Sequence, residues 1–175
     1  AFALWDCLDS VLYLVRDRIG EKPLYYGFSS GVFMFGSELK PLRVHPAWRG
    51  EIDRDILGLY FRNNYVPAPY SIYKNIFKLP PGTFLKLNIQ NISSGLLPEP
   101  TNYWSLLKAA QYGINHPFSG TDEDAISELD KYLKTAISGQ MISDVPLGAF
   151  LSGGVDSSAV VSLMQSQSTQ PIRTF

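Results

Sequence analysis

Two adjacent glycines lie at the centre of Leu151-Ser152-Gly153-Gly154-Val155-Asp156-Ser157-Ser158. The preceding run, residues 145–151, is short and apolar, which is typical of a buried strand. The following run, residues 157–164, has the apolar spacing of a helix. A strand, a tight turn and a helix in this order direct several backbone N–H groups and the positive end of the helix dipole at one point. The sequence therefore predicts an anion site here, and the phosphates of a nucleotide would suit it.

The side chains of this loop strengthen that expectation. Gly153 and Gly154 have no Cβ, so the backbone can approach a phosphate closely. Asp156, Ser157 and Ser158 are residue types that cap helices, and serine hydroxyls can also donate to phosphate oxygens. A turn without a ligand is the alternative, because Gly, Ser and Asp also fill ordinary turns.

The loop differs from the two commonest nucleotide-binding patterns. A P-loop needs a lysine after its last glycine, and no lysine follows Gly154. The G-x-G-x-x-G spacing of dinucleotide folds is also missing. Ser152-Gly153-Gly154-Val155-Asp156-Ser157 instead resembles the S-G-G-x-D-S PP-loop of the ATP-pyrophosphatase family. The resemblance implies a loop that holds the pyrophosphate end of ATP in an enzyme that adenylylates a carboxylate or carbonyl.

Composition excludes several other classes of function. Hydrophobic residues make up 45% and charged residues 18% of the chain, as in ordinary globular proteins. With 15 basic and 16 acidic side chains, the net charge of −1 favours neither nucleic acid nor a membrane surface as a partner. No apolar run approaches the roughly 20 residues that span a bilayer. The single cysteine, Cys7, excludes an internal disulfide, and we expect a cytoplasmic protein.

Antiparallel strands are predicted for the first part of the chain. Residues 2–6 and 11–17 flank a polar turn of hairpin length, and residues 23–28 and 32–35 flank a second turn. We interpret these four strands as a meander, in which each strand pairs with the next along the chain. A further strand is predicted at residues 83–87.

Two helices carry recognisable start signals. Residues 53–64 have helical apolar spacing, with Asp53 and Asp55 near the positive end of the dipole. Thr121 is the expected N-cap of another helix, followed by three acidic residues. The apolar stripe of this second helix is formed by Ile126, Leu129, Leu133 and Ile137.

Together with the loop, several ordered segments resemble glutamine-hydrolysing asparagine synthetases. These segments are Phe2-Ala3-Leu4-Trp5-Asp6, Arg16-Asp17-Arg18-Ile19-Gly20-Glu21-Lys22-Pro23-Leu24-Tyr25-Tyr26, Phe35-Gly36-Ser37-Glu38-Leu39-Lys40, Lys78-Leu79-Pro80-Pro81-Gly82 and Ser143-Asp144-Val145-Pro146. The PP-loop alone indicates only a superfamily, whereas the ordered combination is typical of this family.

The resemblance implies two domains and a chain that is a piece of a longer protein. Residues 1–88 would be the C-terminal part of a type-2 glutamine amidotransferase domain, with the α+β fold of N-terminal-nucleophile glutaminases. Residues 89–117 would form a linker. Most of the polar character lies in residues 88–102, which are rich in Ser, Pro and Gly. Residues 118–175 would begin the synthetase, an α/β ATP-pyrophosphatase domain with a parallel sheet.

The resemblance also implies substrates and site residues. The family uses ATP, L-aspartate and L-glutamine, with Mg²⁺ accompanying the nucleotide, and it releases AMP and pyrophosphate. The expected ATP-binding residues are Leu151, Ser152, Gly153, Gly154, Asp156, Ser157 and Ser158. The glutaminase nucleophile is an N-terminal cysteine, so the internal Cys7 is not expected to be catalytic. We therefore expect this segment alone to be inactive, and a homo-oligomer is compatible with the sequence.

The sequence is also compatible with other functions. Related amidotransferases and β-lactam synthetases share this region but use a different carboxylate acceptor, and a non-catalytic interaction module is a third reading. His45 and His116 stand alone and are interpreted as loop residues. Arg16, Asp17 and Arg18 are interpreted as an internal ion-pair cluster or as a scaffold for the glutaminase site.

Overall fold

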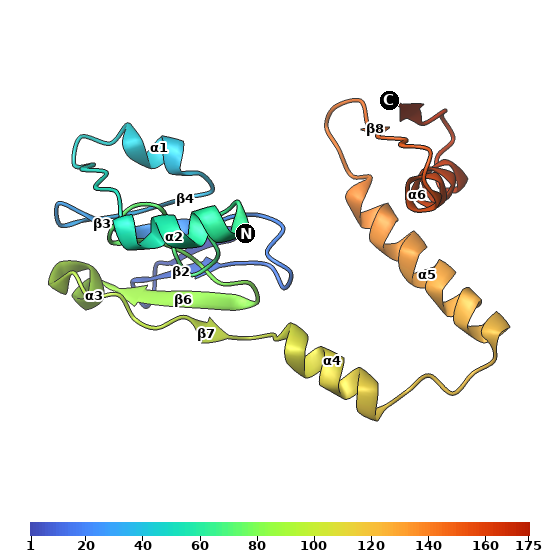
Figure 1. The fold of residues 1–175 in the computed structure, drawn as a ribbon, viewed down its shortest axis with the longest axis horizontal. Helices are drawn as coiled ribbons and strands as arrows, with labels where there is room; N and C mark the ends of the chain where they lie inside the picture. The colour runs from blue at the N-terminus through green and yellow to red at the C-terminus, as the bar shows by residue number, and fades with distance from the viewer. The chain divides into compact units, whose positions relative to one another are not determined.

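A computed structural model describes residues 1–175, which form two units, Ala1–Asn115 and His116–Phe175. The elements of the first unit (Figure 1) are, in order, β1 (Phe2–Asp6), β2 (Val11–Val15), β3 (Tyr25–Ser29), β4 (Val32–Gly36), α1 (Leu39–Arg43), α2 (Arg54–Asn63), β5 (Ile76–Lys78), β6 (Thr83–Asn88), α3 (Ile89–Ser94), β7 (Thr101–Asn102) and α4 (Leu106–Asn115). Those of the second unit are α5 (Asp122–Gln140), β8 (Gly148–Ala149), α6 (Val155–Ser166) and β9 (Arg173–Thr174).

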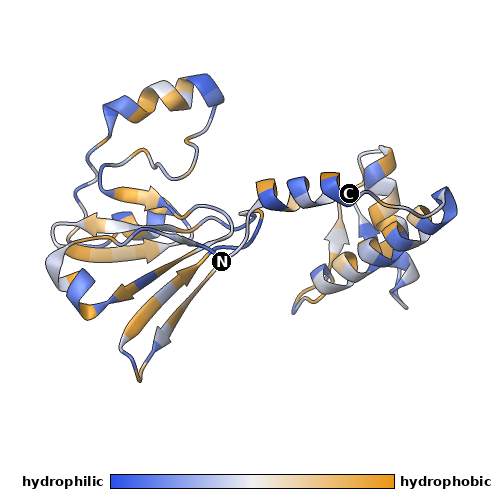
Figure 2. Cartoon of the chain, turned by 90° about the horizontal axis from the view of Figure 1, so that it is seen from below, coloured by the Kyte–Doolittle hydropathy of each residue, from blue (hydrophilic) through white to orange (hydrophobic).

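The strands of the first unit form two antiparallel sheets. One sheet has the order β1-β2-β6-β7, and its central pairing places Leu14 opposite Leu85. The other sheet has the order β4-β3-β5, with Tyr26 opposite both Phe35 and Phe77. The strands of this unit are predominantly hydrophobic in composition (Figure 2), as expected for sheets that cover each other.

The main core lies between these sheets, because its buried side chains come from both of them. Leu14, Leu85 and Leu87 belong to β2 and β6, whereas Tyr26 belongs to β3. Leu24 and Leu79 complete the cluster from the segments before β3 and after β5. Each completely buried leucine contributes roughly 1.5–3 kcal/mol by removal of apolar surface from water. This packing holds the two sheets face to face.

The outer face of the second sheet is covered in part by α1. Met34 on β4, Leu42 on α1 and Ile76 on β5 form a second buried cluster. Trp48 packs against this cluster and meets the Tyr73 ring edge-on, with ring centroids 5.0 Å apart. The first unit therefore has a sheet–sheet–helix layering at this point.

The predicted meander is wrong, although its four strands are present. β2 pairs with β1 on one side and with β6 on the other, whereas β3 pairs with β4 and β5. The chain changes sheets between Val15 and Tyr25. Leu14 on β2 and Leu24, just before β3, thereby reach one core.

Arg16 and Asp17 organise this change of sheet through hydrogen bonds to the backbone. The buried Arg16 guanidinium donates to the carbonyls of Lys22 (3.0 Å), Leu79 (2.6 Å) and Gly20 (2.8 Å). The Asp17 carboxylate accepts from the amides of Gly20 (2.6 Å), Glu21 (2.8 Å) and Lys22 (3.1 Å). The interpretation of these residues as an ion-pair cluster is therefore wrong. The guanidinium forms hydrogen bonds with backbone carbonyls, and the carboxylate forms hydrogen bonds with backbone amides.

The segment expected to be a linker contains regular structure. Asn88 and Asn91 form a reciprocal capping box that begins α3. Strand β7 then adds to the first sheet beside β6, and α4 follows it. The expected domain division stays a prediction, and the structure adds that the first unit continues to Asn115.

The two helices with predicted start signals are present. Asp53 is the N-cap of α2 and accepts from the Asp55 amide at 3.1 Å. Thr121 is the N-cap of α5, where its hydroxyl accepts from the Asp124 amide at 3.2 Å. The Asp124 carboxylate accepts in return from the Thr121 amide at 3.0 Å. Local side-chain chemistry thus sets both helix starts.

The strand predicted for residues 145–151 is shorter than expected. Only Gly148 and Ala149 have strand geometry, and Pro146 cannot donate to a ladder. Val145 and Phe150 are 70% and 87% exposed, so the expectation of a buried strand is wrong for this structure. No helix of the chain combines the length and the apolar character needed to cross a membrane.

Candidate functional site

The glycine loop starts from a short parallel pairing at the end of the chain. Gly148 and Ala149 pair with Arg173 and Thr174 in β9. The Phe175 amide donates to the Ala149 carbonyl at 3.1 Å, and the Leu151 amide donates to the Phe175 carbonyl at 2.9 Å. These bonds fix the backbone up to the first residue of the loop. The predicted order of strand, loop and helix is therefore present.

The two loop glycines differ in backbone conformation. Gly153 adopts φ +81°, a left-handed conformation that other residues enter only with strain. Gly154 has φ −80°, which any residue can adopt. A Cβ at Gly154 would meet only the Ser152 hydroxyl, at 3.5 Å, which is ordinary contact. Packing inside the chain therefore does not require Gly154, whereas close approach by a ligand would.

The serines of the loop do not cap the helix as predicted. Gly154 is the N-cap residue of α6, and no side chain accepts from its first-turn amides. The Ser157 and Ser158 hydroxyls instead donate to the Gly154 carbonyl at 3.1 and 2.8 Å. The Ser152 and Ser157 hydroxyls lie 3.1 Å apart. The correction has a physical reason, because these serines lie within the helix, where the Gly154 carbonyl is within reach.

The uncapped start of α6 is the feature that could bind an anion. The helix has 12 residues, and the amides of Val155, Asp156 and Ser157 have neither a backbone nor a side-chain acceptor, whereas the Ser158 amide donates to the Gly154 carbonyl at 3.1 Å. Such amides and the helix dipole favour negative charge. Asp156 is exposed in the first turn, and Leu151, the residue before Ser152, is 40% exposed. The predicted ATP-binding residues therefore all lie along one loop and the first turn of one helix.

The donor set around the loop does not form a metal site of its own. The chain contains no group of three or more His, Cys, Asp or Glu side chains placed to hold a metal ion. Asp156 is the one carboxylate within the loop and the first turn of α6. A single exposed carboxylate can supply one oxygen ligand to a divalent cation.

Cys7 and His45, which the sequence analysis did not assign to a catalytic site, lie in a turn and just after a helix. Cys7 lies in the predicted turn between β1 and β2, and its side chain is exposed. His45 lies just after α1 and accepts from the Ala47 amide at 3.1 Å. Sequence reasoning missed a pocket around Tyr26 and Glu99, because residues 97–100 were interpreted as linker. The sequence signal that could have indicated this pocket is Leu97-Pro98-Glu99-Pro100, in which three apolar residues flank one carboxylate.

Two family models match the chain in sequence order. A glutamine amidotransferase domain model matches residues 1–104, which include both sheets of the first unit. An asparagine synthase model matches residues 128–175, which include the glycine loop. The chain belongs to the glutamine-hydrolysing asparagine synthetase family.

Curated relatives carry the same family name. The chain is 38% identical over 94% of its length to a putative asparagine synthetase [glutamine-hydrolyzing] 2 of Methanocaldococcus jannaschii. It is 28% identical over 100% of its length to asparagine synthetase [glutamine-hydrolyzing] 3 of Bacillus subtilis, and 34% identical over 93% to asparagine synthetase [glutamine-hydrolyzing] 1 of that organism. The matched regions are 30%, 27% and 24% of these relatives, so the chain spans less than a third of their length.

Proposed function

We propose that the whole protein is a glutamine-dependent asparagine synthase, an ATP-dependent carbon–nitrogen ligase. This proposal rests on the order of the two family-model matches: the glutamine amidotransferase domain model is followed along the same chain by the asparagine synthase model. The first activity releases ammonia, and the second consumes it. A polypeptide that carries both can couple amide hydrolysis to amide formation.

The glycine loop is proposed to bind the triphosphate of ATP, as the start of an ATP-pyrophosphatase domain. The first-turn amides of α6 would donate to phosphate oxygens, with Gly153 and Gly154 allowing close approach. The hydroxyls of Ser152, Ser157 and Ser158 can turn from their present acceptors toward the ligand. Leu151 would lie beside the nucleotide. Asp156 would bind Mg²⁺ through water or orient the loop.

The proposed chemistry proceeds in two steps. A carboxylate oxygen of the aspartate side chain attacks the α-phosphorus of ATP, and the bond to the β-phosphate oxygen breaks, releasing pyrophosphate. Ammonia then attacks the activated carbonyl carbon, and AMP leaves with the carboxylate oxygen that it received. Amides fixed at the phosphates would stabilise the negative charge on the departing pyrophosphate. Excluding water protects the acyl adenylate from hydrolysis.

The first unit is proposed to be the C-terminal part of an N-terminal-nucleophile glutaminase domain. Two antiparallel sheets packed face to face, with α1 on an outer face, support this fold. The exposed Cys7 lies inside the chain at a hairpin turn, so it is not proposed as the nucleophile. We further propose that residues 1–175 alone have neither activity. A single cysteine and the near-neutral charge support a cytoplasmic location.

Product analysis on the full-length protein tests this function. Incubation with ATP, aspartate and glutamine should give asparagine, AMP and pyrophosphate in equal amounts, together with glutamate. Ammonium should replace glutamine as the nitrogen source. Formation of ADP and inorganic phosphate would contradict the adenylylation, and turnover of another carboxylate in place of aspartate would assign a different acceptor.

A further inference from the structure

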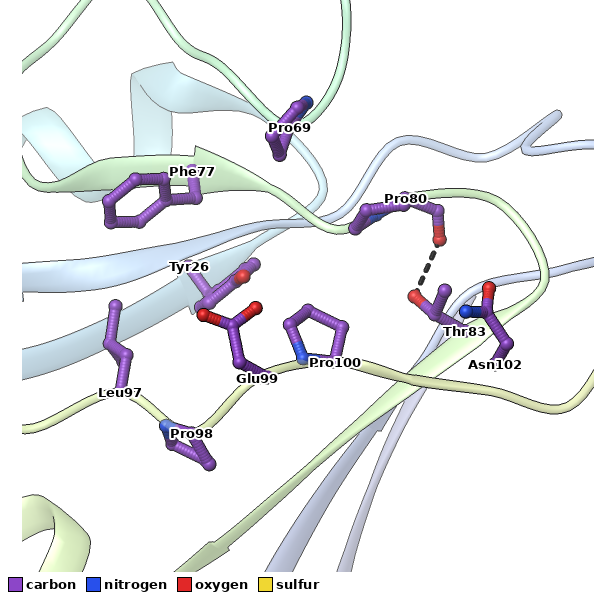
Figure 3. Close-up of a pocket in the computed structure, with 10 residues that line it drawn as sticks. All are labelled: Tyr26, Pro69, Phe77, Pro80, Thr83, Leu97, Pro98, Glu99, Pro100 and Asn102. Atoms are coloured by element: carbon purple, nitrogen blue, oxygen red, sulfur yellow. Dashed lines mark hydrogen bonds between the residues drawn. The ribbon is translucent and has the colours of Figure 1, made fainter.

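A pocket of about 440 Å³ opens in the first unit beside the main core (Figure 3). Its lining comes from β3, β5, the start of β6 and the segment of residues 97–102. The rings of Tyr26 and Phe77 form one part of the wall, with centroids 5.9 Å apart. The other apolar lining residues are Pro69, Pro80, Leu97, Pro98 and Pro100.

One carboxylate faces this apolar lining. Figure 3 shows the Glu99 side chain pointing from the 97–102 segment toward Tyr26. Among the side chains of the lining residues, the hydrogen bond drawn in Figure 3 joins the Thr83 hydroxyl to the Pro80 carbonyl, at 2.7 Å. Glu99 takes part in none of the ion pairs of the chain. Glu99 is exposed, so its carboxylate is open to solvent, and it brings to the pocket lining a negative charge that no ion pair within residues 1–175 neutralises.

Lys78 is the cationic residue next in sequence to a wall residue of the pocket, and its ammonium group already has partners elsewhere. Lys78 follows Phe77, but its ammonium donates to the Val66 carbonyl at 2.6 Å. The same ammonium lies 5.5 Å from the centroid of the Tyr25 ring, and Tyr25 is absent from the pocket lining. Lys78 is thus held by groups outside the pocket lining.

We propose that this pocket binds a small organic ammonium ion that carries an apolar chain. The Glu99 carboxylate would accept a charge-assisted hydrogen bond from the ammonium group. The partly buried Phe77 ring can add attraction for a cation, whereas the buried Tyr26 ring packs behind it. The proline and leucine side chains would contact the alkyl chain. The mixture of apolar walls and one convergent charge is typical of small-molecule sites.

Ligand-observed NMR on the full-length protein tests this proposal, with n-butylammonium as the probe and n-butanol as its uncharged counterpart. The dissociation constant for butylammonium should be on the order of 1–10 mM, as expected for so few ligand atoms. Glu99→Gln should weaken butylammonium binding at least about fivefold. The exposed Glu123, at the start of α5, provides the matched control, and Glu123→Gln should leave the binding unchanged.

A second variant keeps the test decisive if Glu99→Gln does not fold. Phe77→Leu retains an apolar wall but removes one ring, so it should weaken butylammonium binding about threefold with little effect on butanol. Three results would overturn the proposal. These are no binding of butylammonium by the wild-type protein, equal binding of butylammonium and butanol, or equal effects of Glu99→Gln and Glu123→Gln. None of these readouts depends on asparagine synthesis.

Discussion

The Arg16 guanidinium donates a 2.6 Å hydrogen bond to the carbonyl of Leu79, 63 residues further along the chain. This bond joins the loop after β2 to the turn after β5, and therefore one sheet to the other. Nearby, the Arg16 carbonyl accepts from the Tyr103 hydroxyl at 2.7 Å. One residue thus connects three distant segments of the first unit.

Removal of the Arg16 side chain should destabilise the first unit. Arg16→Ala leaves the carbonyls of Lys22, Leu79 and Gly20 without this donor; the bond to Leu79 is buried and the other two are partly buried. We expect a loss of about 2–4 kcal/mol in the free energy of unfolding of this unit. Urea unfolding of the full-length protein measures it. Arg18→Ala, two residues away at an exposed position, should change this free energy by less than about 0.5 kcal/mol.

Stability at low pH should depend on Asp17. Partial burial raises the pKa of Asp17, but hydrogen bonds from the amides of Lys22, Glu21 and Gly20 outweigh it, so the pKa lies below its usual value. A depressed pKa in the folded state stabilises the fold above the unfolded pKa of about 4 and loses that effect as the pH falls through the folded pKa. Unfolding free energy should therefore decline below about pH 4.

Asp17→Asn should flatten this decline, because the amide does not titrate. Urea unfolding between about pH 2.5 and pH 5 checks the expectation, since that window brackets the unfolded pKa. Asp9→Asn, in the exposed turn between β1 and β2, provides the control and should keep the wild-type slope. An Asp17→Asn slope equal to that of the wild-type protein would show that the amide contacts do not influence the titration.

Substitutions at the two loop glycines should separate folding from binding. Gly154→Ala should leave stability unchanged, because its φ is ordinary and the added Cβ meets only Ser152 at 3.5 Å. The same methyl group would obstruct a bound phosphate, so kcat/KM for ATP should fall at least tenfold, about 1.4 kcal/mol of transition-state binding. Gly153→Ala should lose activity and also about 1 kcal/mol of stability through backbone strain.

The control for this pair is Gly139→Ala, near the end of α5. A Cβ at Gly139 would project into open space within a helix. This substitution should therefore keep full activity and stabilise α5 by about 0.5–1 kcal/mol. Wild-type kcat/KM for ATP in Gly154→Ala would mean that the phosphates do not approach the loop as proposed.

Local features of the fold could be predicted from the sequence. The starts of α2 and α5 were recognisable because Asp53 and Thr121 cap their own helices through neighbouring amides. The hairpin of β1 and β2 was recognisable because a four-residue polar turn joins two apolar runs. The order of the strand, the glycine loop and α6 was equally local.

Features that depend on distant partners could not be predicted. Leu14 pairs with Leu85, and no signal near either residue specifies a partner 71 residues away. The Glu99 pocket needs β3, β5 and the 97–102 segment together, although each segment alone is unremarkable. Serine is a common helix-capping residue, but Ser157 and Ser158 lie inside α6, and their hydroxyls therefore donate to the Gly154 carbonyl.

Transfer of oxygen from aspartate to AMP is the most direct test of the proposed adenylylation. The full-length protein would be given aspartate labelled with ¹⁸O in its side-chain carboxylate, together with ATP and ammonium. Attack of that carboxylate on the α-phosphorus predicts one labelled oxygen in the phosphate of each AMP, detected by mass spectrometry. Label found in inorganic phosphate, with ADP as the nucleotide product, would contradict binding of ATP for cleavage at its α-phosphate.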